Sequence, residues 1–118
     1  MTPSDPPNLR HSPRVSLQRS ITVSNSEHSL PCQLLDLSYT GLGLISLHPL
    51  KKGAYQLNFS LPDFDGEHPL SLLGQMIHFK SVRDQYLIGF KLPSLTPHEQ
   101  LVFKGFMQFH KRLTPLTE

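Results

Sequence analysis

The sequence predicts a mainly β domain of about six short antiparallel strands, arranged as a barrel or a sandwich and followed by one C-terminal helix. Apolar and polar residues alternate in several stretches of the chain, a pattern typical of strands with one face in a core. Turn-forming residues separate these stretches at short intervals, as in all-β domains. Only the end of the chain carries apolar residues at helical spacing.

The alternating positions locate the strands. They are Val15, Leu17, Ile21 and Val23; Tyr55, Leu57, Phe59 and Leu61; Leu70, Leu72, Gly74 and Met76; and Tyr86, Ile88, Phe90 and Leu92. Arg19 breaks the first series, and its side chain could reach toward the binding site or toward a neighbouring chain. The third stretch also carries apolar residues at odd-numbered positions, namely Leu73, Ile77 and Phe79, so two alternating series overlap there. Two shorter apolar runs flank a polar turn at residues 36–41.

Residues 97–112 are predicted to form the helix. Thr96 and Glu99 have the spacing of a capping box, and Pro97 would occupy the first helical position. The apolar residues that follow at helical spacing are Leu101, Val102, Phe103, Phe106, Met107, Phe109 and Leu113. We expect this helix to stop before Pro115 and to cover or plug the strands. Part of its wide apolar stripe could instead contact a partner protein.

Length and composition fit one small domain. A chain of 118 residues with 37% hydrophobic residues can bury a single core. We place the domain at residues 9–113, between a flexible proline-rich tail at 1–8 and a short C-terminal tail at 114–118. The net charge is only +2 and the basic residues are dispersed, which argues against a nucleic-acid-binding protein.

Cysteine and histidine usage excludes several kinds of site. The single cysteine, Cys32, rules out an internal disulfide, and we expect it to be buried or half-buried in a strand. The seven histidines lack the spacing of known zinc motifs, so we expect neither a metal nor a cofactor. The chain shows no signal peptide and no apolar run that could insert in a membrane, which favours the cytoplasm.

Arg10 and Arg14 are the first candidate binding residues. Pro13 disfavours a helical conformation at Ser12, so the segment is extended or turned. Two guanidinium groups in such a segment could hold a ligand from two sides. The planar fork of each group matches phosphate oxygens and the O6/N7 edge of guanine. Taken alone, however, these arginines could simply make a tail soluble.

The turn at residues 36–41 is the second candidate. Asp36 can accept hydrogen bonds from the N1–H and N2–H of guanine, and Ser38 can donate to phosphate or base. Gly41 and Gly43 leave the backbone free of side chains where a flat base could lie close. The alternative is an ordinary tight connection, in which Asp and Ser bond the local backbone.

Taken together, the two motifs resemble the signature of the PilZ domain family. They are Arg-x-x-x-Arg at 10–14 and Asp-x-Ser-x-x-Gly at 36–41. The similarity continues in residues 41–44, in Gly53 and in residues 88–90, and it covers about residues 9–113. The resemblance implies a mainly β fold: a six-stranded antiparallel split barrel with a C-terminal α-helix. It also implies a non-enzymatic receptor for the bacterial second messenger cyclic di-GMP.

The resemblance assigns roles to individual residues. The family's phosphate- and guanine-gripping arginines correspond to Arg10 and Arg14. Its ligand-contacting aspartate, serine and glycine correspond to Asp36, Ser38 and Gly41.

One departure from the family pattern bears on the number of ligands. Many members carry an extra arginine directly before the first motif, where this chain has Leu9. Because leucine offers only apolar contact, we expect one cyclic di-GMP per chain rather than a stacked pair. Leu9, His11 and Gly43 are candidates for secondary contacts.

The residues support a sensor rather than an enzyme, since no nucleophile–base pair or nucleotide-hydrolysing motif is present. Ligand binding is expected to order the N-terminal segment and so to signal to an unidentified effector protein. The chain would act as a monomer or weak dimer. One alternative is a ligand-independent adaptor in pilus, flagellar motility or exopolysaccharide systems. Another is a single-stranded nucleic-acid-binding barrel, although the aromatics fall mostly at core or helix positions.

Overall fold

The computed structural model describes the backbone of residues 14–113 and the side chains of residues 14–111. Both predicted tails, 1–8 and 114–118, therefore lie outside the described residues, and so do Leu9, Arg10 and His11. The elements are β1 (Val15–Ser24), β2 (Ser29–Leu37), β3 (Gly41–Ser46), β4 (Ala54–Asp63), β5 (Gly66–Val82), β6 (Gln85–Lys91) and α2 (Pro97–Leu113).

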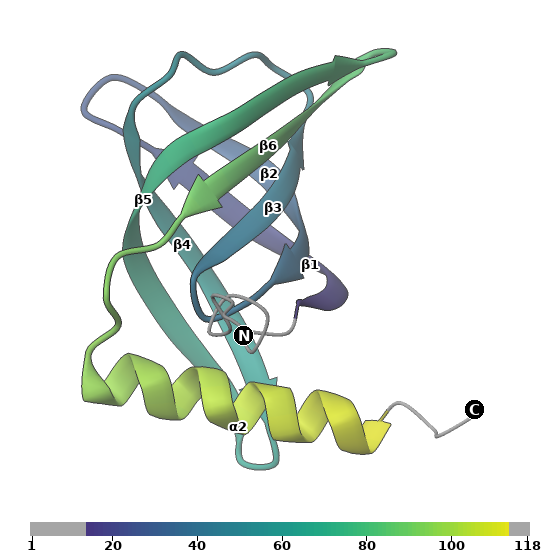
Figure 1. The fold of residues 1–118 in the computed structure, drawn as a ribbon, viewed down its shortest axis with the longest axis vertical. Helices are drawn as coiled ribbons and strands as arrows, with labels where there is room; N and C mark the ends of the chain where they lie inside the picture. Colours follow the sequence, from purple (N-terminus) through teal and green to yellow (C-terminus); the bar gives the residue numbers. More distant parts are fainter. Residues whose placement is uncertain (1–13, 114–118) are drawn as a thin grey trace, which may run out of the picture.

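The six strands form a closed antiparallel barrel in the order β1-β2-β3-β6-β5-β4 (Figure 1). Four of the pairs are hairpins of consecutive strands, namely β1–β2, β2–β3, β4–β5 and β5–β6. β3 does not pair with β4 but with β6, along its whole length from Gly41↔Lys91 to Ser46↔Tyr86. The ring closes where β1 meets β4 in a short ladder from Thr22↔Asn58 to Ser24↔Gln56. The predicted fold class is confirmed, and of the two arrangements left open by the pattern the protein adopts the barrel.

The alternating residues fill the barrel interior because side chains on a strand point to opposite faces in turn. The buried apolar residues of the strands are Ile21, Val23, Leu34, Leu37, Leu42, Leu44, Tyr55, Leu57, Phe59, Leu61, Leu70, Leu72, Met76, Ile88 and Phe90. Cys32 is half-buried against this core, as predicted, and desolvation by burial raises the pKa of its thiol.

A β-bulge changes the parity of the third stretch only at its end, since Leu73 lies before the bulge and is 56% exposed on the outer face. The register between β5 and β6 shifts between Met76 and His78, so one extra residue enters β5 at this point. Before the bulge Met76 is opposite the buried Phe90, and after it Phe79 is opposite the buried Ile88. The residues after the bulge therefore follow the other parity, and His78 turns to the outer face beside Gly89.

Arg19 joins β1 to β4 and β5 beyond the end of the closing ladder. Its Nε donates to the carbonyl oxygen of Ser60 at 2.9 Å, and its guanidinium pairs with the carboxylate of Glu67. The β1–β4 ladder ends at Thr22, so Arg19 bonds a carbonyl where strand pairing has stopped. In the structure Arg19 contacts these strands of its own barrel rather than the Arg14–Asp36 region, contrary to one of our two expectations for it.

Helix α2 lies across one end of the barrel (Figure 1) and packs against β4. Its N-terminus is the predicted capping box: the Glu99 N–H donates to Thr96 Oγ1 at 3.1 Å, and the Thr96 N–H donates to Glu99 Oε1 at 2.9 Å. Val102, Phe103 and Phe106 are buried. The helix thus covers the barrel core, as one of the two interpretations of its apolar stripe predicted.

Candidate ligand-binding site

The turn between β2 and β3 is built around the buried hydroxyl of Ser38. The backbone N–H groups of Thr40 and Gly41 donate to Ser38 Oγ at 3.3 and 3.2 Å, and the Ser38 N–H donates to the Gly41 carbonyl at 2.8 Å. Ser38 is only 2% exposed. These bonds fix the path of the chain between the two strands, so the structure gives Ser38 a role in shaping the turn. Its predicted contact with a ligand stays a prediction.

Arg14 and Asp36 meet at the outer edge of this turn. The β1–β2 ladder pairs Val15 with Leu37 and Ser16 with Asp36, which brings the start of β1 beside the end of β2. Arg14 Nη1 lies 2.5 Å from Asp36 Oδ1. Because both side chains are partly exposed, the net contribution of this ion pair to stability is small, of order 0–1 kcal/mol. Its main effect is to hold the guanidinium in one place.

Gly41 and Gly43 are required by close approaches of different kinds. A Cβ at Gly41 would lie 2.7 Å from the Phe90 carbonyl oxygen, so a side chain there would push β3 away from β6. A Cβ at Gly43 would lie 3.0 and 3.1 Å from the two carboxylate oxygens of Asp36. Gly41 thus serves the fold, while Gly43 makes room for the carboxylate that holds Arg14.

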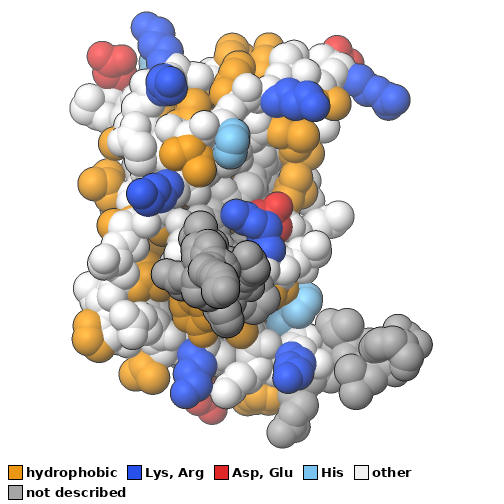
Figure 2. All heavy atoms as spheres, viewed as in Figure 1, with side chains coloured by type: hydrophobic (Ala, Val, Ile, Leu, Met, Phe, Trp, Pro, Cys, Tyr) orange, Lys and Arg blue, Asp and Glu red, His pale blue; other side chains and the backbone are white. Residues whose placement is uncertain are grey.

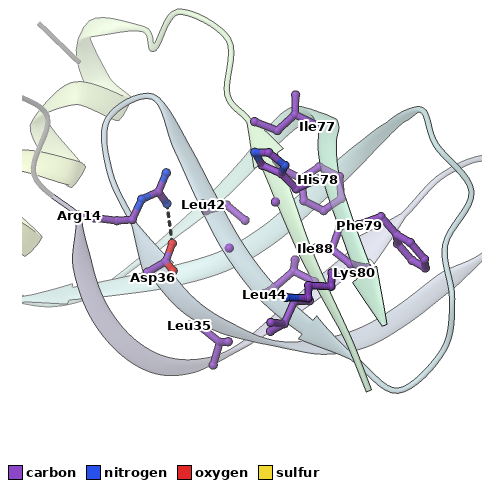
Figure 3. Close-up of a pocket in the computed structure, with 14 residues that line it drawn as sticks. Arg14, Leu35, Asp36, Leu42, Leu44, Ile77, His78, Phe79, Lys80 and Ile88 are labelled. Carbon is purple, nitrogen blue, oxygen red and sulfur yellow. Dashed lines mark hydrogen bonds and ion pairs between the residues drawn. The ribbon is translucent and has the colours of Figure 1, made fainter. Parts of the chain in front are cut away.

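A hollow of about 600 Å³ opens beside the ion pair on the outer face of β3, β5 and β6. This volume lies within the ~300–1,000 Å³ range of small-ligand sites. Figure 3 shows Arg14 and Asp36 on one side of the hollow and Ile77, His78 and Phe79 on the other. Its remaining lining residues are Leu35, Leu42, Gly43, Leu44, Lys80, Leu87, Ile88, Gly89 and Phe90.

The charges around the hollow favour an anionic ligand. Arg14 and Lys80 line it, and Lys91 lies one row further along β6 on the same outward-facing parity as Gly89. The single acidic residue among its lining side chains, Asp36, is already paired with Arg14. On the face seen in Figure 2, Lys and Arg side chains are spread over the surface. Phosphate groups are the common ligands of such arrangements of arginine and lysine.

Tyr39 connects the turn to α2. Its ring centroid lies 5.8 Å from that of Phe103 in the helix, and burial raises the pKa of its hydroxyl group. The backbone of the same turn is tied to the segment before α2, since the Leu92 N–H donates to the Thr40 carbonyl at 2.9 Å. A change in the turn therefore reaches the helix through direct contacts.

The structure brings Arg14, Asp36, Ser38, Gly41 and Gly43 together around the turn, and their contacts with a ligand stay predictions. Arg10, Leu9 and His11 lie outside the described residues, so their predicted contacts stay predictions. Within residues 14–111 no group of three or more His, Cys, Asp and Glu side chains is arranged to hold a metal ion.

Sequence reasoning missed the far side of the hollow, where His78 and Lys80 lie. One signal was present, because Gly89 interrupts an alternating strand, and a glycine there often marks a close approach. No helix in the part of the chain that the structure describes is long and apolar enough to span a membrane.

The model of the PilZ domain family matches residues 8–108, and the chain therefore belongs to this family. Its members are binding and adaptor proteins rather than enzymes. No protein of curated function matches the chain in sequence.

Solved structures share the fold. The Bacillus subtilis inhibitor of motility, MotI/DgrA, superposes with a TM-score of 0.74 at 9% identity, over 90% of this chain and 53% of that one. The PilZ domain of Escherichia coli YcgR, solved with c-di-GMP, gives 0.67 at 16% identity, over 87% of this chain and 92% of that one. Escherichia coli YcgR in complex with c-di-GMP superposes with a TM-score of 0.65 at 17% identity, over 87% of this chain and 46% of that one. This chain thus spans about half the length of MotI/DgrA and of that YcgR structure.

Proposed function

We propose that the chain is a non-enzymatic receptor for cyclic di-GMP. The observation that carries this proposal is the Arg14 guanidinium, held by Asp36 at the edge of a hollow floored by glycine and rimmed by basic residues. Membership of the PilZ domain family supports it, as do the YcgR structures, which contain c-di-GMP. A cyclic dinucleotide supplies both the phosphates for arginine and the flat bases for a glycine floor.

Each site residue has a distinct part in the proposed complex. Arg14 donates to a phosphate or to the O6/N7 edge of guanine, and Arg10 does the same from the segment before it. The carboxylate of Asp36, which lies over Gly43, accepts from the N1–H and N2–H groups of guanine while it orients Arg14. Ser38 holds the turn and Gly41 keeps β3 against β6, so both set where Asp36 lies.

One cyclic di-GMP binds per chain in this proposal. The position that carries an extra arginine in many family members is Leu9, which cannot bind the phosphates of a second, stacked ligand. Calorimetry should therefore give a stoichiometry of one. A stoichiometry of two would overturn this part of the proposal without affecting the binding site itself.

Ligand binding is proposed to affect two parts of the protein that a partner could contact, the N-terminal segment and helix α2. Arg14 already contacts Asp36, and the ligand is proposed to complete the site by ordering the segment that carries Arg10. The turn also contacts α2 through Tyr39 and Phe103, so a ligand on the turn acts on the helix as well. Hydrogen exchange should show increased protection of residues 8–13 on binding. Equal protection with and without ligand would refute the ordering.

Calorimetric titration with cyclic di-GMP tests the proposal. Arg14→Ala and Asp36→Ala each remove a charged hydrogen-bonding partner, which costs about 1.5–3 kcal/mol, or roughly 10- to 150-fold in affinity. Lys111→Ala and Asp84→Ala are matched controls, because each removes one charge of the same sign from an exposed residue outside the hollow. These controls should bind like the wild type.

Two other results would redirect the proposal. No binding by the wild type at tens of micromolar would favour the ligand-independent adaptor. Tighter binding of single-stranded oligonucleotides than of cyclic di-GMP, seen in a gel-shift assay, would favour the nucleic-acid-binding barrel instead.

A further inference from the structure

The hollow continues beyond the ion pair along a single row of paired residues. Asp36 on β2 is opposite Gly43 on β3, Gly43 is opposite Gly89 on β6, and Gly89 is opposite His78 on β5. All four residues therefore face outward together. Three strand spacings of about 4.8 Å separate the first and last members, a path of roughly 14 Å along the curved wall of the barrel. The two glycines between them form a floor without side chains.

His78 leans over this floor. A Cβ at Gly89 would lie 3.3 Å from His78 Cβ and 3.4 Å from its Cδ2, so the imidazole covers the space that a side chain at Gly89 would take. Figure 3 shows the ring on the opposite side of the hollow from Arg14. A purine ring system is shorter than this path along the floor. A ligand that touches both walls therefore needs a second base or a phosphate at the His78 end.

The charged groups near His78 are basic, so the imidazole would interact with an anionic group of the ligand. Lys80 follows it on β5 and lines the same hollow, and Lys52 lies with His78 around the neighbouring depression. Across the floor are Arg14 and Asp36, which neutralise each other, and Lys91 is one row along on β6. Among the described residues around the hollow, no unpaired carboxylate faces the imidazole.

We propose that His78 is a second contact for the ligand, in which its protonated imidazole donates to a phosphate oxygen at the end of the hollow opposite Arg14. This inference rests on the proposed binding of cyclic di-GMP and adds that the affinity depends on pH. Histidine changes its charge between about pH 5 and 8. Only the charged form makes the full interaction with phosphate, so ligand binding strengthens as the pH falls through this range.

The test is calorimetry with cyclic di-GMP at about pH 8 and about pH 6 on the wild type, His78→Gln and His48→Gln. His48 is a matched control, because it is exposed in the loop after β3 and lines a different depression. We expect the affinity of the wild type and of His48→Gln to rise by about threefold to tenfold toward pH 6, the range of partly exposed charge-assisted contacts. His78→Gln should bind equally at both pH values and match the wild type at about pH 8.

The outcomes separate the two proposals. An equal pH dependence in His78→Gln and the wild type overturns the role of His78 and leaves the receptor function in place. A wild type that fails to bind at either pH refutes the receptor function, and the role of His78 with it.

Discussion

Gly41 and Gly43 lie two residues apart on β3, yet alanine should impair stability at Gly41 and ligand binding at Gly43. At Gly43 the added Cβ would lie 3.0 and 3.1 Å from the carboxylate oxygens of Asp36, which are the end of a partly exposed side chain that can move. At Gly41 it would lie 2.7 Å from the backbone carbonyl oxygen of Phe90, which β3 and β6 hold in their ladder. One clash therefore displaces a functional group, and the other displaces a strand.

The magnitudes follow from what has to move. Overpacking against backbone costs about 1–3 kcal/mol, so Gly41→Ala should lower the melting temperature by roughly 5–15 °C. In Gly43→Ala the shift of the carboxylate is offset by the lower entropy of the unfolded chain, about 0.4–1 kcal/mol. Its unfolding free energy should therefore change by less than about 0.5 kcal/mol. Its affinity for cyclic di-GMP should fall by about tenfold or more, because the Arg14–Asp36 hydrogen bond is displaced.

Thermal unfolding by circular dichroism and calorimetric titration of the same two variants measure these effects. The reasoning is refuted if Gly43→Ala binds cyclic di-GMP as tightly as the wild type, because the carboxylate position would then not matter. It also fails if Gly41→Ala is as stable as the wild type, since the contact with the Phe90 carbonyl would then impose no constraint.

Three further predictions concern stability. Thr96→Ala removes half of the capping box and should destabilise the domain by about 0.5–2 kcal/mol in urea unfolding, whereas no change would show that the cap is dispensable. Phe103→Ala empties a fully buried site under α2 and should cost about 3–5 kcal/mol in the same assay; a loss below about 1 kcal/mol would mean that the helix is not docked. The third prediction concerns stability at low pH. The Asp65 N–H donates to the Asp63 carboxylate and lowers its pKa below the usual 3.8, and His68 lowers it further by a smaller amount. This stabilisation is complete above that value and is lost as the pH falls through the lower folded-state pKa, so Asp63→Asn should flatten the fall in stability below about pH 4. An unchanged acid profile would contradict the assignment.

The strands and helix were predictable because their signals are local. The alternation from Tyr55 to Leu61 follows from the pleat of any half-buried strand, and the capping box needs only Thr96 and Glu99 at the right spacing. Closure of the barrel was not predictable from the pattern alone, since the pairing of Thr22 with Asn58 joins distant strands and leaves no periodic trace. The resemblance to the PilZ family supplied what periodicity could not.

The candidate site was predictable only in part. Asp36 and Gly43 were proposed because their residue types suit a guanine site, and the structure pairs them across β2 and β3. Ser38 has the right residue type as well, but its burial depends on how the turn folds onto the core. His78 was missed because a bulge in β5 sets which way it points, and a one-residue shift of register reverses every side chain beyond it.

The central claim is that cyclic di-GMP lies in the hollow between Arg14 and His78. Mapping of backbone amide shifts by NMR during a titration with the ligand tests it most directly. The account predicts that the largest changes fall at Asp36, Gly43 and Gly89, which form the wall and floor of the hollow. Changes centred on another surface, or none at saturating ligand, would contradict it.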